Sequence, residues 1–152
     1  MDCHTNKSFC LVFVLLLFNI SCTICQSDKI HFTQGVSVHI INGLPSNNNP
    51  LNFRCQSKDD DLGYHTLLVG EEYYWEFHLN FFIPNTLFFC HFYWQSKDKS
   101  FDVFDGLMKF PSCNHPSLHD IKCFWLVKAD GFYFSEHRGD PNSPDWNKLV
   151  SW

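Results

Sequence analysis

Apolar and polar side chains alternate along most of this 152-residue chain, with the period of two that is typical of half-buried β-strands. The clearest case is residues 73–80, where the odd positions are Tyr, Trp, Phe and Leu, and the even positions include Glu, His and Asn. The pattern of hydrophobic residues predicts further strands at residues 36–42, 51–56, 65–69, 101–107, 123–128 and 132–134.

Residues 87–94, Leu-Phe-Phe-Cys-His-Phe-Tyr-Trp, form the densest apolar run outside the N-terminus. The run is too short for a typical helix, and polar turn sequences flank it on both sides. One face is almost wholly apolar and the other is mostly apolar, which indicates a central strand rather than an edge. The face that we expect to be buried carries Phe88, Cys90, Phe92 and Trp94.

Turn chemistry separates these segments. Two prolines and three consecutive asparagines occupy residues 45–50, a polar turn is expected at 96–100, a loop at 109–121, and Asp130-Gly131 is a strong hairpin signal. No helical periodicity follows residue 26. We therefore predict an all-β fold, a small antiparallel β-sandwich of about 7–8 strands with disulfides.

The N-terminus has the features of a secretory signal peptide. Residues 9–20 are apolar, follow a polar segment that carries Lys7, and fall short of the roughly 20 residues that cross a bilayer. Thr23 and Cys25 are small residues at the positions that a signal peptidase requires. We predict a cleaved signal peptide at 1–25, one domain at 26–152, a secreted, extracellular location, and no stable membrane insertion.

Four cysteines remain after cleavage, and an even number in a small exported domain predicts two disulfides whose pairing the sequence leaves open. An alternative is zinc, because Cys113, His115, His119 and Cys123 could supply two thiolates and two imidazoles. Oxidation in an exported protein favours the disulfides. The cysteines concerned are Cys55, Cys90, Cys113 and Cys123.

The formal charge is −5 with neutral histidines, and lysines and arginines form no cluster. Phosphate recognition needs such a cluster, so we expect no nucleic-acid partner. The sequence also offers no cofactor-binding motif, and we predict neither a cofactor nor a metal.

Five motifs in order resemble those of the plant self-incompatibility S-protein homologue family. They lie at 38–42 (Val-x-Ile-x-Asn), 55–63 (Cys-x-Ser-Lys-Asp-Asp-Asp-Leu-Gly), 86–94, 101–105 (Phe-Asp-Val-Phe-Asp) and 123–125 (Cys-x-Trp). The resemblance implies a small secreted β-sandwich. For founding members of the family it implies a stigma ligand that a receptor on pollen recognises. The separation of Cys113 from Cys123 departs from the closely spaced cysteines of many members, so the disulfide pairing is not carried over.

The leading hypothesis is a non-enzymatic, monomeric signalling ligand whose loops contact a cell-surface receptor protein. The acidic run at 59–61 could alternatively bind Ca²⁺, but it lacks the alternating carboxylates of a calcium loop, and we expect its side chains to cap backbone N–H groups. The candidate recognition loops carry Asp59, Asp60, Asp61, Glu71, Glu72, Lys97, Asp98 and Lys99, with the 112–122 segment as a further exposed candidate.

Two other classes of function compete with this hypothesis. A small secreted hydrolase or ribonuclease would need paired histidines, and His78 and His91 are the candidates on strands that we expect to be neighbours. An extracellular carbohydrate-binding module would need an exposed row of aromatic rings.

Overall fold

The computed structural model describes residues 33–80, 85–107, 113 and 121–152, and these form nine strands in two sheets. The all-β prediction is therefore confirmed. The ninth strand comes from the C-terminal tail. The strands are β1 (Thr33–Asn42), β2 (Leu51–Gln56), β3 (Asp61–Leu67), β4 (Glu72–Asn80), β5 (Leu87–Trp94), β6 (Lys97–Asp105), β7 (Ile121–Lys128), β8 (Gly131–Ser135) and β9 (Asn147–Val150).

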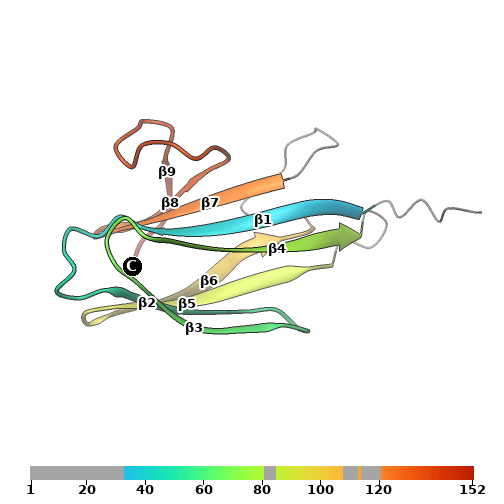
Figure 1. Ribbon diagram of the computed structural model, residues 1–152, viewed down its shortest axis with the longest axis horizontal. Helices are drawn as coiled ribbons and strands as arrows, with labels where there is room; N and C mark the ends of the chain where they lie inside the picture. The colour runs from blue at the N-terminus through green and yellow to red at the C-terminus, as the bar shows by residue number, and fades with distance from the viewer. Residues whose placement is uncertain (1–32, 81–84, 108–112, 114–120) are drawn as a thin grey trace, which may run out of the picture. The chain divides into compact units, whose positions relative to one another are not determined.

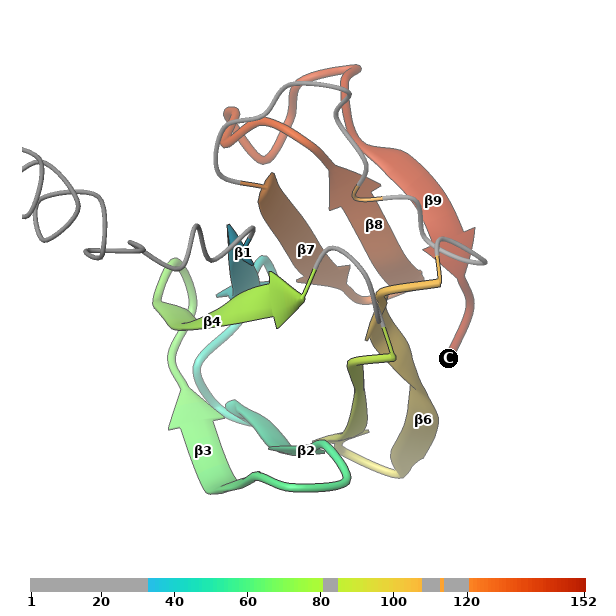
Figure 2. The same cartoon turned by 90° about the vertical axis from the view of Figure 1, so that its right-hand side faces the viewer.

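The strands pack as two layers (Figures 1 and 2). One sheet has the order β4-β1-β7-β8-β9 and the other has the order β3-β2-β5-β6. Neighbouring strands are antiparallel except β1 and β7, which run parallel from the Val36–Ile121 pair to the Asn42–Val127 pair. The predicted antiparallel sandwich is thus present with one parallel pair. No hairpin joins β1 to β7, because strands of both sheets lie between them in the sequence, so the two can run parallel.

Strand β5 has the predicted bounds and lies between β2 and β6. Its four predicted core residues are each at most 7% exposed, whereas Leu87 and Phe89 on the opposite face are 40% and 37% exposed. Strand β5 is therefore central in its sheet, but only its inner face is covered. The inner face packs against aromatic side chains from the other layer, such as Phe132 of β8.

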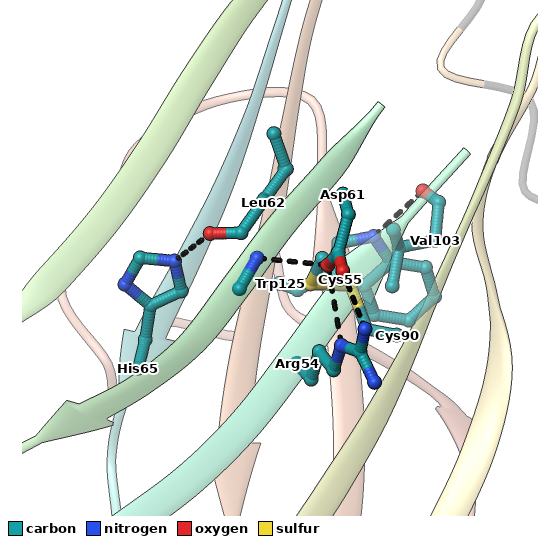
Figure 3. Close-up of a disulfide and its surroundings, with 9 residues drawn as sticks. Arg54, Cys55, Asp61, Leu62, His65, Cys90, Val103 and Trp125 are labelled. Atoms are coloured by element: carbon teal, nitrogen blue, oxygen red, sulfur yellow. Dashed lines mark hydrogen bonds and ion pairs between the residues drawn. A yellow bond between two sulfur atoms is a disulfide. The ribbon is translucent and has the colours of Figure 1, made fainter. Parts of the chain in front are cut away.

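Two buried polar groups join the layers. The Trp125 indole N–H of β7 donates to the Val103 carbonyl of β6 at 3.0 Å (Figure 3). The fully buried Asn42 amide donates to the Leu67 carbonyl at 2.8 Å, and its oxygen accepts from the Leu44 N–H at 2.9 Å. These bonds satisfy groups that would be costly to bury unpaired, and they fix the end of β1 against the end of β3.

Both predicted disulfides are present. Cys55 and Cys90 lie opposite each other on β2 and β5 and are fully buried (Figure 3). Cys113 bonds Cys123 at the start of β7, ten residues further along. The thiols of the zinc alternative are thus consumed in a disulfide. The two histidines of that alternative, the other residues at 109–112 and 114–120 of the predicted loop, and the signal peptide at 1–25 lie outside the described residues. The predicted loop ends one residue too late, because β7 begins at Ile121.

Several other predicted bounds differ from the structure, and the largest differences are at β6, β3 and β1. The turn between β5 and β6 is confined to Gln95 and Ser96, because Gln95 adopts a left-handed backbone conformation with φ of 55° that reverses the chain in two residues. Residues 97–99 therefore belong to strand β6. Strand β3 begins at Asp61 rather than His65, and β1 begins at Thr33 rather than Val36.

Candidate recognition surfaces

The predicted recognition residues lie at opposite ends of the sandwich. Asp59 and Asp60 connect β2 to β3 at one end. Strand β3 then crosses the sheet, so Glu71 and the start of β4 lie at the other end, as does the β5–β6 turn before Lys97. These residues cannot form one continuous contact surface, and each group has to be judged by its own contacts.

The loop after β2 is organised by Ser57. Its hydroxyl accepts from the Asp59 and Asp60 N–H groups at 3.2 and 2.9 Å, and the Ser57 N–H donates to the Asp60 carbonyl. The prediction that the aspartates cap this loop was therefore wrong for Asp59 and Asp60, since the serine takes that role. Their carboxylates are exposed, beside a shallow pocket of about 180 Å³ that His78 also lines.

Asp61 differs from its two neighbours because it starts β3 and forms a bidentate ion pair with Arg54 on β2 (Figure 3). It also accepts from the Gly63 N–H at 3.0 Å, which is the one case of the predicted capping in this run. The Arg54 bond, followed by the Gly63 bond, lowers the pKa of Asp61. The Asp61 carboxylate is thus already paired with Arg54 and Gly63.

Glu71 and Glu72 also have different roles. Glu71 is exposed, and its carboxylate accepts from the Leu68 N–H at 2.8 Å, closing the β3–β4 turn. Glu72 lies in β4 with a side chain only 15% exposed, 2.5 Å from His39 and 2.8 Å from Arg138. The prediction that Glu72 is an exposed loop residue was wrong, because Glu72 is the first residue of β4.

Residues 97–99 are likewise not loop residues. The Lys97 ammonium donates to the Ala129 carbonyl at 2.5 Å and lies 5.0 Å from the Trp94 ring. Lys99 is half-buried in β6, and Asp98 is exposed and 2.5 Å from His91. Of the three, only Asp98 presents its charge from an exposed position.

The histidines proposed for catalysis are not neighbours. His78 lies on β4, whose partner is β1, and His91 lies on β5, whose partners are β2 and β6. Each points away from the core on a different sheet, because its flanking residues in the alternation are buried or pack against the core. The prediction of adjacent strands was wrong, because β4 and β5 belong to different sheets although they follow each other in the sequence.

A Ser-His-Glu arrangement is present that the sequence reasoning missed. The Ser37 hydroxyl is 3.0 Å from Nε2 of His39, and Nδ1 of His39 is 2.5 Å from the Glu72 carboxylate. The His39 ring stacks between Tyr74 and Phe124. The spacing of Ser37 and His39 on one face of β1 was visible in the sequence, but nothing in the sequence placed Glu72 beside them.

Among the described residues, the backbone of β1 offers this arrangement no oxyanion donor. Ser37 is 6% exposed and lies on β1, which pairs with β4 on one side and with β7 on the other. The backbone N–H groups of such a strand are committed to its two neighbours, whereas acyl transfer needs N–H groups directed at the reacting oxygen. Within the described residues, the His39–Glu72 contact joins β1 to β4, and the Ser37–His39 contact lies within β1.

The fold and the two disulfides define a small all-β sandwich that presents charged loops, and comparison with known proteins identifies its family. The family model described as plant self-incompatibility protein S1 matches residues 37–152. S-protein homolog 24 of Arabidopsis thaliana is 32% identical over 86% of this chain and 84% of its own length. S-protein homolog 3 of the same plant is 30% identical over 90% of each chain. The chain belongs to the plant self-incompatibility S1 family.

Proposed function

We propose that this protein is a secreted signalling ligand that acts by binding a receptor protein on the surface of a plant cell. Family membership carries the proposal, because the family is named for self-incompatibility, in which pollen is recognised. The buried disulfide and the aromatic core provide a rigid scaffold, which lowers the entropic cost of binding through exposed loops. The signal-peptide pattern at residues 1–25 supports secretion.

Binding is favoured over catalysis by the environment of the Ser37, His39 and Glu72 side chains. A strand with neighbours on both sides offers no spare backbone N–H group to a tetrahedral intermediate. The ribonuclease alternative also loses support, since its two histidines lie on different sheets. A role in recognition requires only exposed groups, such as the carboxylates of the Asp59–Asp60 loop and the side chains on the outer faces of the sheets.

The test is a saturation-binding experiment with the chain secreted from a plant host. Mass spectrometry of the purified protein should show an N-terminus at Gln26. The fluorescently labelled protein should bind pollen or other plant cells in a saturable manner, and excess unlabelled protein should displace it. Protein that has been reduced and alkylated serves as the unfolded control.

Two results would overturn the proposal. One is binding that stays linear with concentration and is shared by the alkylated control. The other is labelling by a fluorophosphonate probe, or ester hydrolysis, that disappears in Ser37→Ala, since this would show that Ser37 is a nucleophile.

A further inference from the structure

The outer face of the four-stranded sheet combines an aromatic column with an acidic column. Strand β5 presents Leu87, Phe89, His91 and Tyr93 on this face, and the His91 and Tyr93 rings stack with centroids 4.3 Å apart. Strand β6, at the edge of the sheet, presents Asp98, Ser100 and Asp102, all exposed.

The register places each acidic residue beside a ring. Phe89 lies opposite Asp102, and Tyr93 lies opposite Asp98. Side chains directly opposite each other on antiparallel strands have Cβ atoms about 5 Å apart. A group that contacts one of these rings therefore also lies within reach of the neighbouring carboxylate.

The positive charge of this face is already paired. The guanidinium of Arg54 forms the ion pair with Asp61 and lies 5.2 Å from the centre of the Tyr64 ring. Oδ1 of Asp98 lies 2.5 Å from Nε2 of His91, so its other carboxylate oxygen is the one left for a partner. Asp102 has no ion pair or hydrogen bond with the residues that the structure describes. The charge available to a partner on this face is therefore negative, and Tyr64, which is 70% exposed, extends the aromatic surface onto β3.

We propose that this aromatic-acidic face binds a basic segment of a partner protein, with Arg or Lys side chains over Phe89 and Tyr93 and paired with Asp102 and Asp98. The proposal rests on the proposed function, because it assigns the chemistry of the receptor contact. Aromatic faces attract cations, and a carboxylate beside the ring strengthens the contact by a charge-assisted hydrogen bond. Tyrosine side chains are also typical of protein-binding hot spots.

Other partners fit this face less well. A neutral apolar surface would remove water from Asp98 and Asp102 without pairing them, which is costly. An acidic surface, such as an anionic membrane, would be repelled. A neutral sugar could stack on the rings but would leave the carboxylates without a cation.

The direct test uses a labelled peptide that alternates Arg and Thr, with Glu-Thr and Gln-Thr peptides of equal length for comparison. We expect only the Arg-Thr peptide to shift the amide NMR signals of β5, β6 and the residues around Tyr64. High salt should weaken the binding of this peptide. Asp98→Asn with Asp102→Asn should lower its affinity about tenfold. The matched control, Asp59→Asn with Asp60→Asn, removes the same charge elsewhere and should change it less than twofold.

Several results would overturn the inference. They are equal losses in the two double variants, shifts confined to the Asp59–Asp60 loop, or binding of a neutral oligosaccharide on β5 when the Arg-Thr peptide does not bind. Retained dispersion of the NMR spectrum verifies that each variant is folded. If saturable binding to cells is unaffected by Asp98→Asn with Asp102→Asn, the inference fails and the proposed function stands. If the peptide binds as expected but no cell shows saturable binding, the proposed function fails.

Discussion

Two tryptophans in the core differ in what their indole N–H groups contact. Trp125 is fully buried and donates to the Val103 carbonyl across the two sheets. Trp75 is 8% exposed, and its Nε1 has no partner among the described residues. Making the same substitution at the two positions therefore separates two contributions to stability, that of the indole hydrogen bond and that of indole packing.

We expect Trp125→Phe to lower the free energy of unfolding by about 2 kcal/mol more than Trp75→Phe. Both variants lose similar volume, but only the first leaves a buried carbonyl unpaired, which costs about 1–3 kcal/mol, and the complete burial of Trp125 adds to the difference. Urea unfolding followed by circular dichroism measures both values. Equal losses would show that the bond between the layers contributes nothing beyond packing.

At the residue scale, the sequence predicted which side chains of β5 are buried, because a strand must bury its apolar face whatever its neighbours are. It did not predict the partners of single polar groups. Ser37 and His39 share a face by simple alternation, but Glu72 reaches them only because β4 pairs with β1. The sequence also did not predict that the Ser57 hydroxyl caps its loop, because the three adjacent aspartates were the more obvious capping candidates.

At the scale of elements, the β7–β8 hairpin is the most strongly determined turn. The hairpin predicted from Asp130-Gly131 is present. Lys128 pairs with Gly131, so the two-residue connection is Ala129 and Asp130, and Gly131 begins β8. Gly131 has a φ of 152°, and a Cβ there would lie 2.3 Å from the Val150 carbonyl oxygen. The glycine is therefore needed for the close approach of the end of β9.

Asp130 in this turn should make stability depend on pH. The ammonium of Lys148 at 2.9 Å, and then the Tyr133 hydroxyl at 2.8 Å, lower the pKa of its carboxyl. A group whose pKa is lowered by folding stabilises the protein above its unfolded pKa of about 3.9, and this contribution is lost as the pH falls through the folded value.

We expect Asp130→Asn to reduce the loss of stability on acidification below about pH 4, and to lower stability slightly at neutral pH. Thermal unfolding at a series of pH values measures this slope. Asp59→Asn is the control, because its exposed side chain has no hydrogen bond with the described residues. An identical slope in wild type and Asp130→Asn would contradict the argument.

The strands themselves were largely readable because alternation is local, and β2 and β5 have the predicted bounds. Strand β6 starts earlier than predicted because polar residues 97–99 gave no strand signal, and pairing with β5 extends it. Strand β9 was missed as a strand for the same reason, since its short sequence gains its structure from β8.

At the scale of the whole molecule, the order of the strands in the two sheets could not be predicted from the sequence. The parallel pairing of β1 with β7 joins residues that are 85 positions apart in the sequence, such as Val36 and Ile121. Neither segment has a sequence feature that indicates which strand it pairs with. This order decides which candidate residues can act together. It separates His78 from His91, places Asp59 and Glu71 at opposite ends, and assembles the aromatic-acidic face from β3, β5 and β6.

The two disulfides should stabilise this arrangement to different extents. Cys55–Cys90 closes a separation of 35 residues and Cys113–Cys123 closes one of 10 residues. The entropy that cross-linking removes from the unfolded chain rises with loop length, which gives about 4 kcal/mol for the first and about 3 kcal/mol for the second. The first also lies wholly within the core, so its replacement should leave a poorly filled space between β2 and β5.

We therefore expect the double variant Cys55→Ala with Cys90→Ala to lose about 4 kcal/mol or more, and Cys113→Ala with Cys123→Ala to lose less. Urea unfolding of both variants and of wild type measures the difference. If the second variant were the less stable one, loop length would not govern the contributions, and the Cys113 segment would have to pack on the sandwich more tightly than its short loop implies. Binding to the Arg-Thr peptide should survive in the second variant, because Cys123 and β7 belong to the opposite sheet from the aromatic-acidic face.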